Sequence, residues 1–180
     1  MSQILILTGS SRPNSAGKSV VEAVKKVVNS RDDVNANVVD VNSLNLPFFN
    51  GTASPSTEGF VPEDANAKTW TDQVAAADAV VLVTPEYNGS LSAIQKNAID
   101  WISAEWADKP VALVGYGWGG ATRAHENARI VLENVKAKVM PVTTNLSFMK
   151  EIGVDGAILH QNKDDTQLNA TVDNIVNVLE

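Results

Sequence analysis

Short aliphatic runs alternate along this chain with segments in which hydrophobic residues repeat at the helical interval, and this alternation limits the possible folds. A run such as "ILILT" has hydrophobic residues at consecutive positions, which is typical of a strand buried on both faces of a sheet. The expected strands are Ile4–Gly9, Asn37–Val41, Ala79–Thr84, Val111–Tyr116 and Val139–Val142. The expected helices are Ala16–Ser30, Glu63–Ala77, Ser92–Ser103, Ala121–Ala137 and Asp165–Leu179.

This order of elements predicts an α/β fold with a doubly wound, five-stranded parallel sheet and helices on both faces. The strand order expected is 2-1-3-4-5, in a single domain that spans residues 1–180. In such a sheet the winding reverses between strands 1 and 3, and ligands bind at the carboxyl ends of the strands there. The loops after strands 1 and 3 are therefore where binding chemistry is expected.

Composition excludes several classes of function. The formal charge of −7 argues against a broad nucleic-acid surface, which needs a basic face. The chain has no cysteine, so disulfides, thiolate metal sites and a cysteine nucleophile are excluded, and its two histidines, His125 and His160, lie far apart in sequence. No apolar run approaches the roughly 20 residues of a membrane span, and no secretory signal is evident, so a cytoplasmic protein is expected.

The loop after the first strand, "TGSSRPNSAGKS", leads directly into the first helix. A helix N-terminus offers unpaired N–H groups and partial positive charge, which together suit a phosphate. Ser10 and Ser15 add hydroxyl donors, while Arg12 and Lys18 add positive charge. The spacing matches neither a P-loop nor a GxGxxG motif. We therefore expect the loop to bind a single phosphate group. The alternative is that the serines only cap the helix, but the position at the reversal of winding favours phosphate.

The loop after the third strand, "TPEYNGS", combines a rigid proline with a turn pair. Pro85 fixes its own backbone, and Asn88-Gly89 tolerates positive φ. Such a loop can present backbone groups to a flat heterocycle, with Tyr87 beside it. The alternative is a plain turn in which Ser90 or Ser92 caps the next helix.

Three segments, "GSSRPNS", "PEYNGSLSAIQKNAIDW" and "GYGWGGA", together resemble the NADPH-dependent FMN reductase family of flavodoxin-like flavoproteins. The resemblance implies that FMN binds non-covalently at the loops described above. By this resemblance the phosphate loop consists of Ser10, Arg12, Ser15, Gly17, where an Asn is common, and Lys18. The loop along the isoalloxazine ring consists of Pro85, Glu86, Tyr87 and Asn88, and the third flavin loop of Gly117, Trp118, Gly119 and Gly120.

The chain departs from the family pattern in two places. Ser92-Ala93 replaces a frequent Pro-Gly, which we expect to alter only the turn. Trp118 adds a bulky side chain among glycines and puts the shape of the acceptor pocket in doubt.

The activity implied is hydride transfer from NADPH or NADH to FMN and then to a quinone-like, azo or similar acceptor, or to free flavin. The partners expected are a small-molecule acceptor and further copies of the chain, as a homodimer or homotetramer, without nucleic acid or membrane. The flavin carries the chemistry, so no catalytic side chain and no metal is predicted. The alternative is a non-enzymatic electron carrier of the flavodoxin type, or a flavin-binding regulatory module. Arg12 disfavours the carrier.

Several residues remain with two interpretations each. Trp101 and Trp106 suit either the core or a subunit interface. Tyr116, like Trp118, borders the predicted crevice. His125 is expected to face solvent rather than to act in catalysis, and Glu86 to fix backbone geometry rather than to donate a proton. Shorter expectations are a surface ion pair between Lys96 and Asp100, and packing of Phe48–Gly51 over the crevice or a partner subunit.

Overall fold

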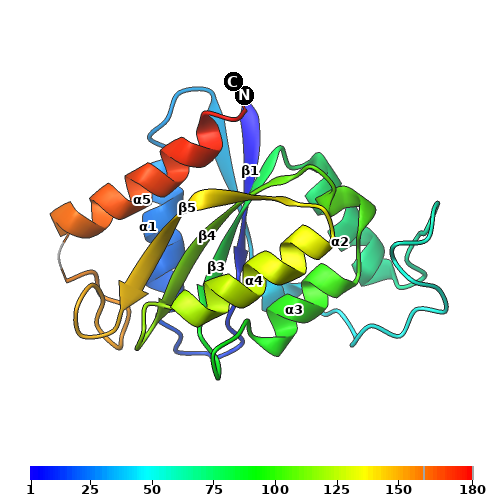
Figure 1. The fold of residues 1–180 in the computed structure, drawn as a ribbon, viewed down its shortest axis with the longest axis horizontal. Helices are drawn as coiled ribbons and strands as arrows, with labels where there is room; N and C mark the ends of the chain where they lie inside the picture. Colours follow the sequence, from blue (N-terminus) through cyan, green and yellow to red (C-terminus); the bar gives the residue numbers. More distant parts are fainter. Residues whose placement is uncertain (160, 180) are drawn as a thin grey trace.

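The computed structural model describes residues 1–159 and 161–179, and its centre is a parallel sheet (Figure 1). The strands are β1 (Ser2–Thr8), β2 (Val34–Val39), β3 (Ala79–Pro85), β4 (Pro110–Gly117) and β5 (Lys138–Ser147). They lie in the order β2-β1-β3-β4-β5, and all neighbouring pairs are parallel. This confirms the predicted strand order and places the loops after β1 and β3 side by side.

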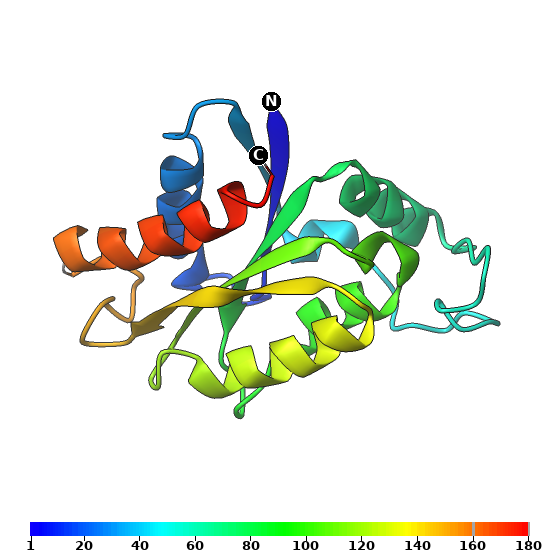
Figure 2. The same ribbon diagram turned by 45° about the horizontal axis from the view of Figure 1, so that its top comes forward.

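The helices cover the sheet on both faces. They are α1 (Gly17–Val28), α2 (Ala65–Ala76), α3 (Ala93–Asp100), α4 (Thr122–Asn134) and α5 (Gln161–Val176), with short 3-10 helices η1 (Val41–Leu44) and η2 (Ala104–Trp106). Figures 1 and 2 show α1 and α5 together on one face, with α2, α3 and α4 on the other. The segment between η1 and α2 extends away from the sheet in both views. In the described part of the chain, no helix is both long and apolar enough to cross a membrane.

The fifth strand is longer than the sequence indicated. The expected strand ended at Val142, whereas β5 continues to Ser147 through a polar stretch. Pro141 falls inside it, and a register shift against β4 occurs nearby, between Val111 and Leu113 of that strand. Because β5 is an edge strand, a residue without an N–H and a run of half-exposed polar side chains are both tolerated there.

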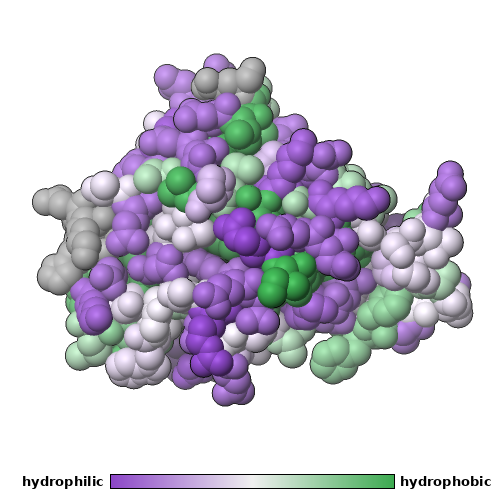
Figure 3. Space-filling view, in the orientation of Figure 1, coloured by the Kyte–Doolittle hydropathy of each residue, from purple (hydrophilic) through white to green (hydrophobic). Residues whose placement is uncertain are grey.

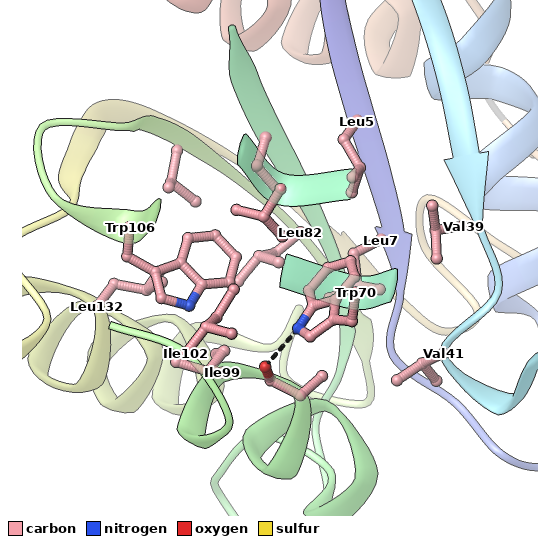
Figure 4. Close-up of a cluster of buried hydrophobic side chains, with 14 of the residues drawn as sticks. Leu5, Leu7, Val39, Val41, Trp70, Leu82, Ile99, Ile102, Trp106 and Leu132 are labelled. Atoms are coloured by element: carbon pink, nitrogen blue, oxygen red, sulfur yellow. Dashed lines mark hydrogen bonds between the residues drawn. The ribbon is translucent and has the colours of Figure 1, made fainter. Parts of the chain in front are cut away.

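The core on the face of α2, α3 and α4 contains two of the tryptophans whose placement the sequence left open. Trp101 and Trp106 are both buried within the chain, and Figure 4 shows Trp106 among its neighbours. Trp106 meets Trp70 edge to face, with ring centroids 6.2 Å apart, and Trp70 Nε1 donates to the Ala98 carbonyl at 2.7 Å. Of the two alternatives, core packing is therefore the one the structure bears out.

The outer surface shown in Figure 3 is mainly hydrophilic, with small hydrophobic spots. The exposed large hydrophobic side chains include Phe48 at 77% and Trp118 at 73% exposure. Isolated apolar side chains are ordinary on a protein surface. Lys96 Nζ lies 2.6 Å from Asp100 Oδ1, so the expected surface pair on α3 is confirmed.

Candidate functional site

A cavity of about 240 Å³ opens beside the loop between β1 and α1. It is lined by Ser10, Arg12, Ser15, Gly17 and Lys18, together with Asp40, Asn42 and Tyr116 from elsewhere in the chain. The structure thus brings the predicted phosphate-loop residues around one space. Their hydroxyl, guanidinium and ammonium groups form a donor set that suits an anion.

The loop is shaped by close approach and by local hydrogen bonds. A Cβ on Gly9 would lie 2.7 Å from Pro85 Cδ, so glycine lets the loops after β1 and β3 touch. Ser10 Oγ accepts from Arg12 N at 3.2 Å, and Ser15 Oγ accepts from Gly17 N at 3.1 Å. The Ser15 contact is the capping role that the alternative interpretation expected, yet Ser15 also lines the cavity.

Residues after β2 complete one side of this cavity, and the sequence analysis missed them. Asn42 Nδ2 donates to the Ser10 carbonyl at 2.9 Å, and Asp40 accepts from Thr8 Oγ1 at 3.2 Å. Burial raises the pKa of Asp40, but hydrogen bonds from Asn42 and Thr8 and the charge of Lys18 outweigh burial and hold the pKa below its usual value. Asp40 and Asn42 can be identified from the sheet topology, because β2 neighbours β1 and the carboxyl ends of both strands lie at the same edge of the sheet.

The loop after β3 turns tightly at Asn88-Gly89. Both residues have positive φ, 53° and 77°, and the flanking Tyr87 and Ser90 exchange backbone hydrogen bonds of 3.0 and 3.1 Å. This is the arrangement of a two-residue hairpin turn with left-handed central residues. Asn88 and Gly89 thus adopt the positive φ values that the sequence predicted they could tolerate. The turn holds Tyr87 with its hydroxyl 2.9 Å from Ser10 Oγ.

Glu86 fixes backbone geometry, as expected. Its Oε2 accepts from the backbone N–H groups of Arg123 and Ala124 at 3.1 and 3.3 Å, at the start of α4. The N-cap residue of α4, Ala121, provides no side-chain hydrogen bond, so Glu86 supplies the missing cap from another loop. The carboxylate also lies at the positive end of the helix dipole, where negative charge is stabilised.

Ser92 does more than the sequence indicated. Its hydroxyl accepts from Gln95 N at 3.2 Å and so caps α3, which the plain-turn alternative allowed. The same hydroxyl donates to the Gly9 carbonyl in a short hydrogen bond. The expectation that Ser92-Ala93 alters only the turn is therefore wrong, because Ser92 also ties α3 to the loop after β1.

The loop after β4 packs against the loop after β3, but its tryptophan does not line the cavity. A Cβ on Gly117 would lie 3.3 Å from Glu86 Cβ, and Gly120 has a φ of 66°. Trp118 does not line the 240 Å³ cavity, and its ring meets the edge of Phe148 at a centroid distance of 5.5 Å. The structure therefore brings Gly117 to the predicted site and separates the Trp118 ring from the phosphate loop.

His125 is buried, at 6% exposure, so the expectation that it faces solvent is wrong. Its Nδ1 lies 3.2 Å from Asn145 Nδ2, which also donates to the Gly120 carbonyl at 2.7 Å. Burial, and secondarily the charge of Arg129, lowers the pKa of His125 to about 4. The neutral His125 therefore contacts Asn145, which in turn hydrogen-bonds the Gly120 end of the loop after β4. The other histidine, His160, lies outside the described residues.

A second cavity of about 330 Å³ adjoins the first, and the two share Ser11. Phe48 and Tyr87 line it, together with Ser92, Ala93 and Ile94 at the start of α3. The expected packing of the Phe48–Gly51 segment over the crevice is thus seen for Phe48, while Phe49 packs edge to face on Trp101 at 5.1 Å. Among the described residues, no group of acidic or histidine side chains is arranged to hold a metal ion.

The sheet order and the paired helices define a flavodoxin-like α/β protein, and comparison with solved structures agrees. FerB, a flavoenzyme NAD(P)H:(acceptor) oxidoreductase from Paracoccus denitrificans, superposes with a TM-score of 0.76 at 23% identity, over 98% of each chain. At that identity the likeness shows the fold alone.

Sequence comparison identifies the family. The model of the NADPH-dependent FMN reductase family matches residues 2–150, and the chain belongs to this family. It is 33% identical to the NAD(P)H-dependent FMN reductase ntnL of Nectria sp, over 88% of this chain and 81% of that protein. It is 32% identical to a quinone reductase of Escherichia coli strain K12, over 95% of this chain and 85% of that protein.

Proposed function

We propose that this protein is an FMN-dependent NAD(P)H oxidoreductase that reduces a small quinone-like acceptor. The observation that carries the proposal is the cavity beside the β1–α1 loop, where Ser10, Arg12, Ser15 and Lys18 surround a space of about 240 Å³. The cavity lies at the reversal of winding and at the start of a helix, two places where phosphate groups bind. The donor set fits the single phosphate of FMN.

The residues of the chain would share the work of binding as follows. Arg12 and Lys18 balance the phosphate charge, and Ser10 and Ser15 line the space around it. The turn at Asn88-Gly89 presents backbone groups to the ring, which Pro85, Glu86 and Tyr87 support. The Gly117–Gly120 loop, with Trp118 and Gly119 at its tip, flanks the same edge. FMN bound there supplies the hydride-accepting chemistry, while the protein binds and orients it.

The acceptor and the biological setting belong to the same proposal. The 32% identity to the quinone reductase of Escherichia coli supports a quinone-like acceptor, with azo compounds or free flavin as further candidates. We expect one FMN-binding domain over residues 1–180, in the cytoplasm, assembled as a homodimer or homotetramer. The projecting segment between η1 and α2 supports an assembly of copies, since it extends beyond the body of the sheet (Figure 2).

The first test is spectroscopic. Purified protein should take up FMN and turn yellow, and the colour should bleach under NADPH or NADH without oxygen and return with a quinone. Flavin that binds but is reduced by neither nucleotide would refute the reductase and leave the electron carrier or regulatory module.

The second test addresses the phosphate loop. Arg12→Ala should weaken FMN binding by about 1.5–3 kcal/mol, because a charge-assisted hydrogen bond to the phosphate is lost. Lys26→Ala removes an exposed cation from the far end of α1 and is the matched control, which should leave affinity unchanged. If Arg12→Ala binds FMN as the control does, the phosphate lies elsewhere.

A further inference from the structure

The Tyr116 side chain reaches the phosphate loop from a strand that does not adjoin it. Tyr116 belongs to β4, and β3 lies between β4 and β1. Neighbouring strands are about 4.8 Å apart, so β4 and β1 are separated by two such spacings, which the Tyr116 side chain and the loop after β1 bridge together. There its hydroxyl lies 2.8 Å from Ser15 Oγ and lines the same cavity, although the residue as a whole is 3% exposed.

Gly17 makes room for this hydroxyl. A Cβ at position 17 would lie 2.4 Å from Tyr116 Oη and 3.0 Å from Tyr116 Cζ, closer than a real Cβ can approach. Gly17 does not have a positive φ, so backbone conformation is not the reason for glycine. Glycine also costs a helix about 1 kcal/mol relative to alanine. The close approach of the tyrosine is therefore what this position accommodates.

The pairing of the two hydroxyls leaves one proton for a ligand. Ser15 Oγ already accepts from Gly17 N at 3.1 Å. When Ser15 and Ser10, which also hydrogen-bonds Tyr116, both donate to the Tyr116 oxygen, the Tyr116 proton is left for a ligand. Tyr116 lines the cavity whose cationic side chains are Arg12 and Lys18. An anion in this cavity would receive the Tyr116 proton.

We propose that Tyr116 is a phosphate-binding residue of this protein and that its hydroxyl, paired with Ser15, completes the donor set for the FMN phosphate. The inference rests on the proposed FMN site and adds to it a side chain from β4. Burial raises the pKa of Tyr116, and the hydrogen bonds with Ser15 and Ser10 and the charge of Arg12 only partly offset this effect. The hydroxyl thus stays neutral and able to donate at physiological pH.

The test compares FMN with riboflavin, which has the same ring and no phosphate. Fluorescence titration should show that Tyr116→Phe weakens FMN binding about 10–100-fold, as expected for one lost hydrogen bond to a charged group, and leaves riboflavin binding unchanged. Phe148→Leu is the control, because Phe148 meets the Tyr116 ring edge to face at 6.3 Å and does not line the cavity. Phe148→Leu should change both affinities equally or not at all.

A double-mutant cycle with Gly17 adds a readout that a purely structural tyrosine would not give. Gly17→Ala should weaken FMN binding when Tyr116 is present, because the added Cβ displaces the hydroxyl, and should have a smaller effect in Tyr116→Phe, where only the contacts of 3.0 Å with Cζ and 3.1 Å with Ser15 Oγ remain. Unchanged FMN affinity in Tyr116→Phe, or equal losses of FMN and riboflavin, would overturn the inference while leaving the FMN site in place. Wild-type protein that binds FMN no more tightly than riboflavin would overturn both.

Discussion

Acidification should destabilise this protein through His125. The pKa of the histidine falls from 6.5 to about 4 on folding, because burial excludes the charged form. A lowered native pKa means that the stabilisation is fully present above pH 6.5 and is lost as the pH falls through about 4. At about 1.36 kcal/mol per pKa unit, the loss between pH 7 and pH 4 is roughly 3 kcal/mol.

The measurement is the free energy of unfolding in urea at pH 7, 5.5 and 4, for wild type and for His125→Gln. Glutamine keeps a polar side chain near Asn145 but does not titrate. The wild type should lose about 3 kcal/mol more than the variant over this interval, since carboxylates titrate equally in both. Parallel curves for the two proteins would refute the reasoning, whatever the stability of the variant at pH 7.

Three further predictions concern the stability of the protein. Glu86→Ala should lower the free energy of unfolding by about 1–2 kcal/mol, because α4 loses its cap, while Glu22→Ala on exposed α1 surface should change it by less than about 0.5. Gly89→Ala should lower the thermal midpoint by several degrees, since its φ of 77° disfavours a Cβ; an unchanged midpoint would contradict this. A double-mutant cycle on Lys96 and Asp100 should give a coupling below about 1 kcal/mol, because the pair is half-exposed.

The sequence predicted β1, β3 and β4, where aliphatic residues run continuously, and the strand order followed. The strand expected at Asn37–Val41 is instead Val34–Val39, and Val41 lies in η1. The end of β5 was not predictable in this way, because Pro141 and the polar residues after it resemble a loop. These residues form a strand because the edge of β4 that does not pair with β3 is free to pair with them. The long edge strand is thus a consequence of the assembled sheet, which local patterns do not contain.

The cavity-lining residues of the proposed phosphate loop were predictable because they are close together in sequence, from Ser10 to Lys18. The contact of Tyr116 with this loop was only partly predictable. Strand periodicity places Tyr116 on the same face as Val114, toward α1, but its contact with Ser15 depends on space left by Gly17. Such contacts join three separate segments, and no spacing rule in one segment encodes them.

The prediction for His125 failed for a related reason. Polar residues in the first turn of a helix usually face solvent, and nothing in "TRAHENA" argues otherwise. In the structure, the Asn145 side chain on β5 contacts both the imidazole of His125 and the Gly120 carbonyl. A Cβ on Gly115 would lie 2.4 Å from its Nε2, so the sheet itself is shaped around the ring.

The links between the loops after β1 and β3 bear on how fast a ligand is exchanged. Tyr87 joins Ser10, and Ser92 joins Gly9, through bonds made entirely within the protein. Because the protein itself holds both loops in place, little conformational entropy remains to be lost when a ligand binds. Association should then approach the diffusional rate, and the time that a ligand remains bound should depend on the strength of its own contacts rather than on the reopening of the loops.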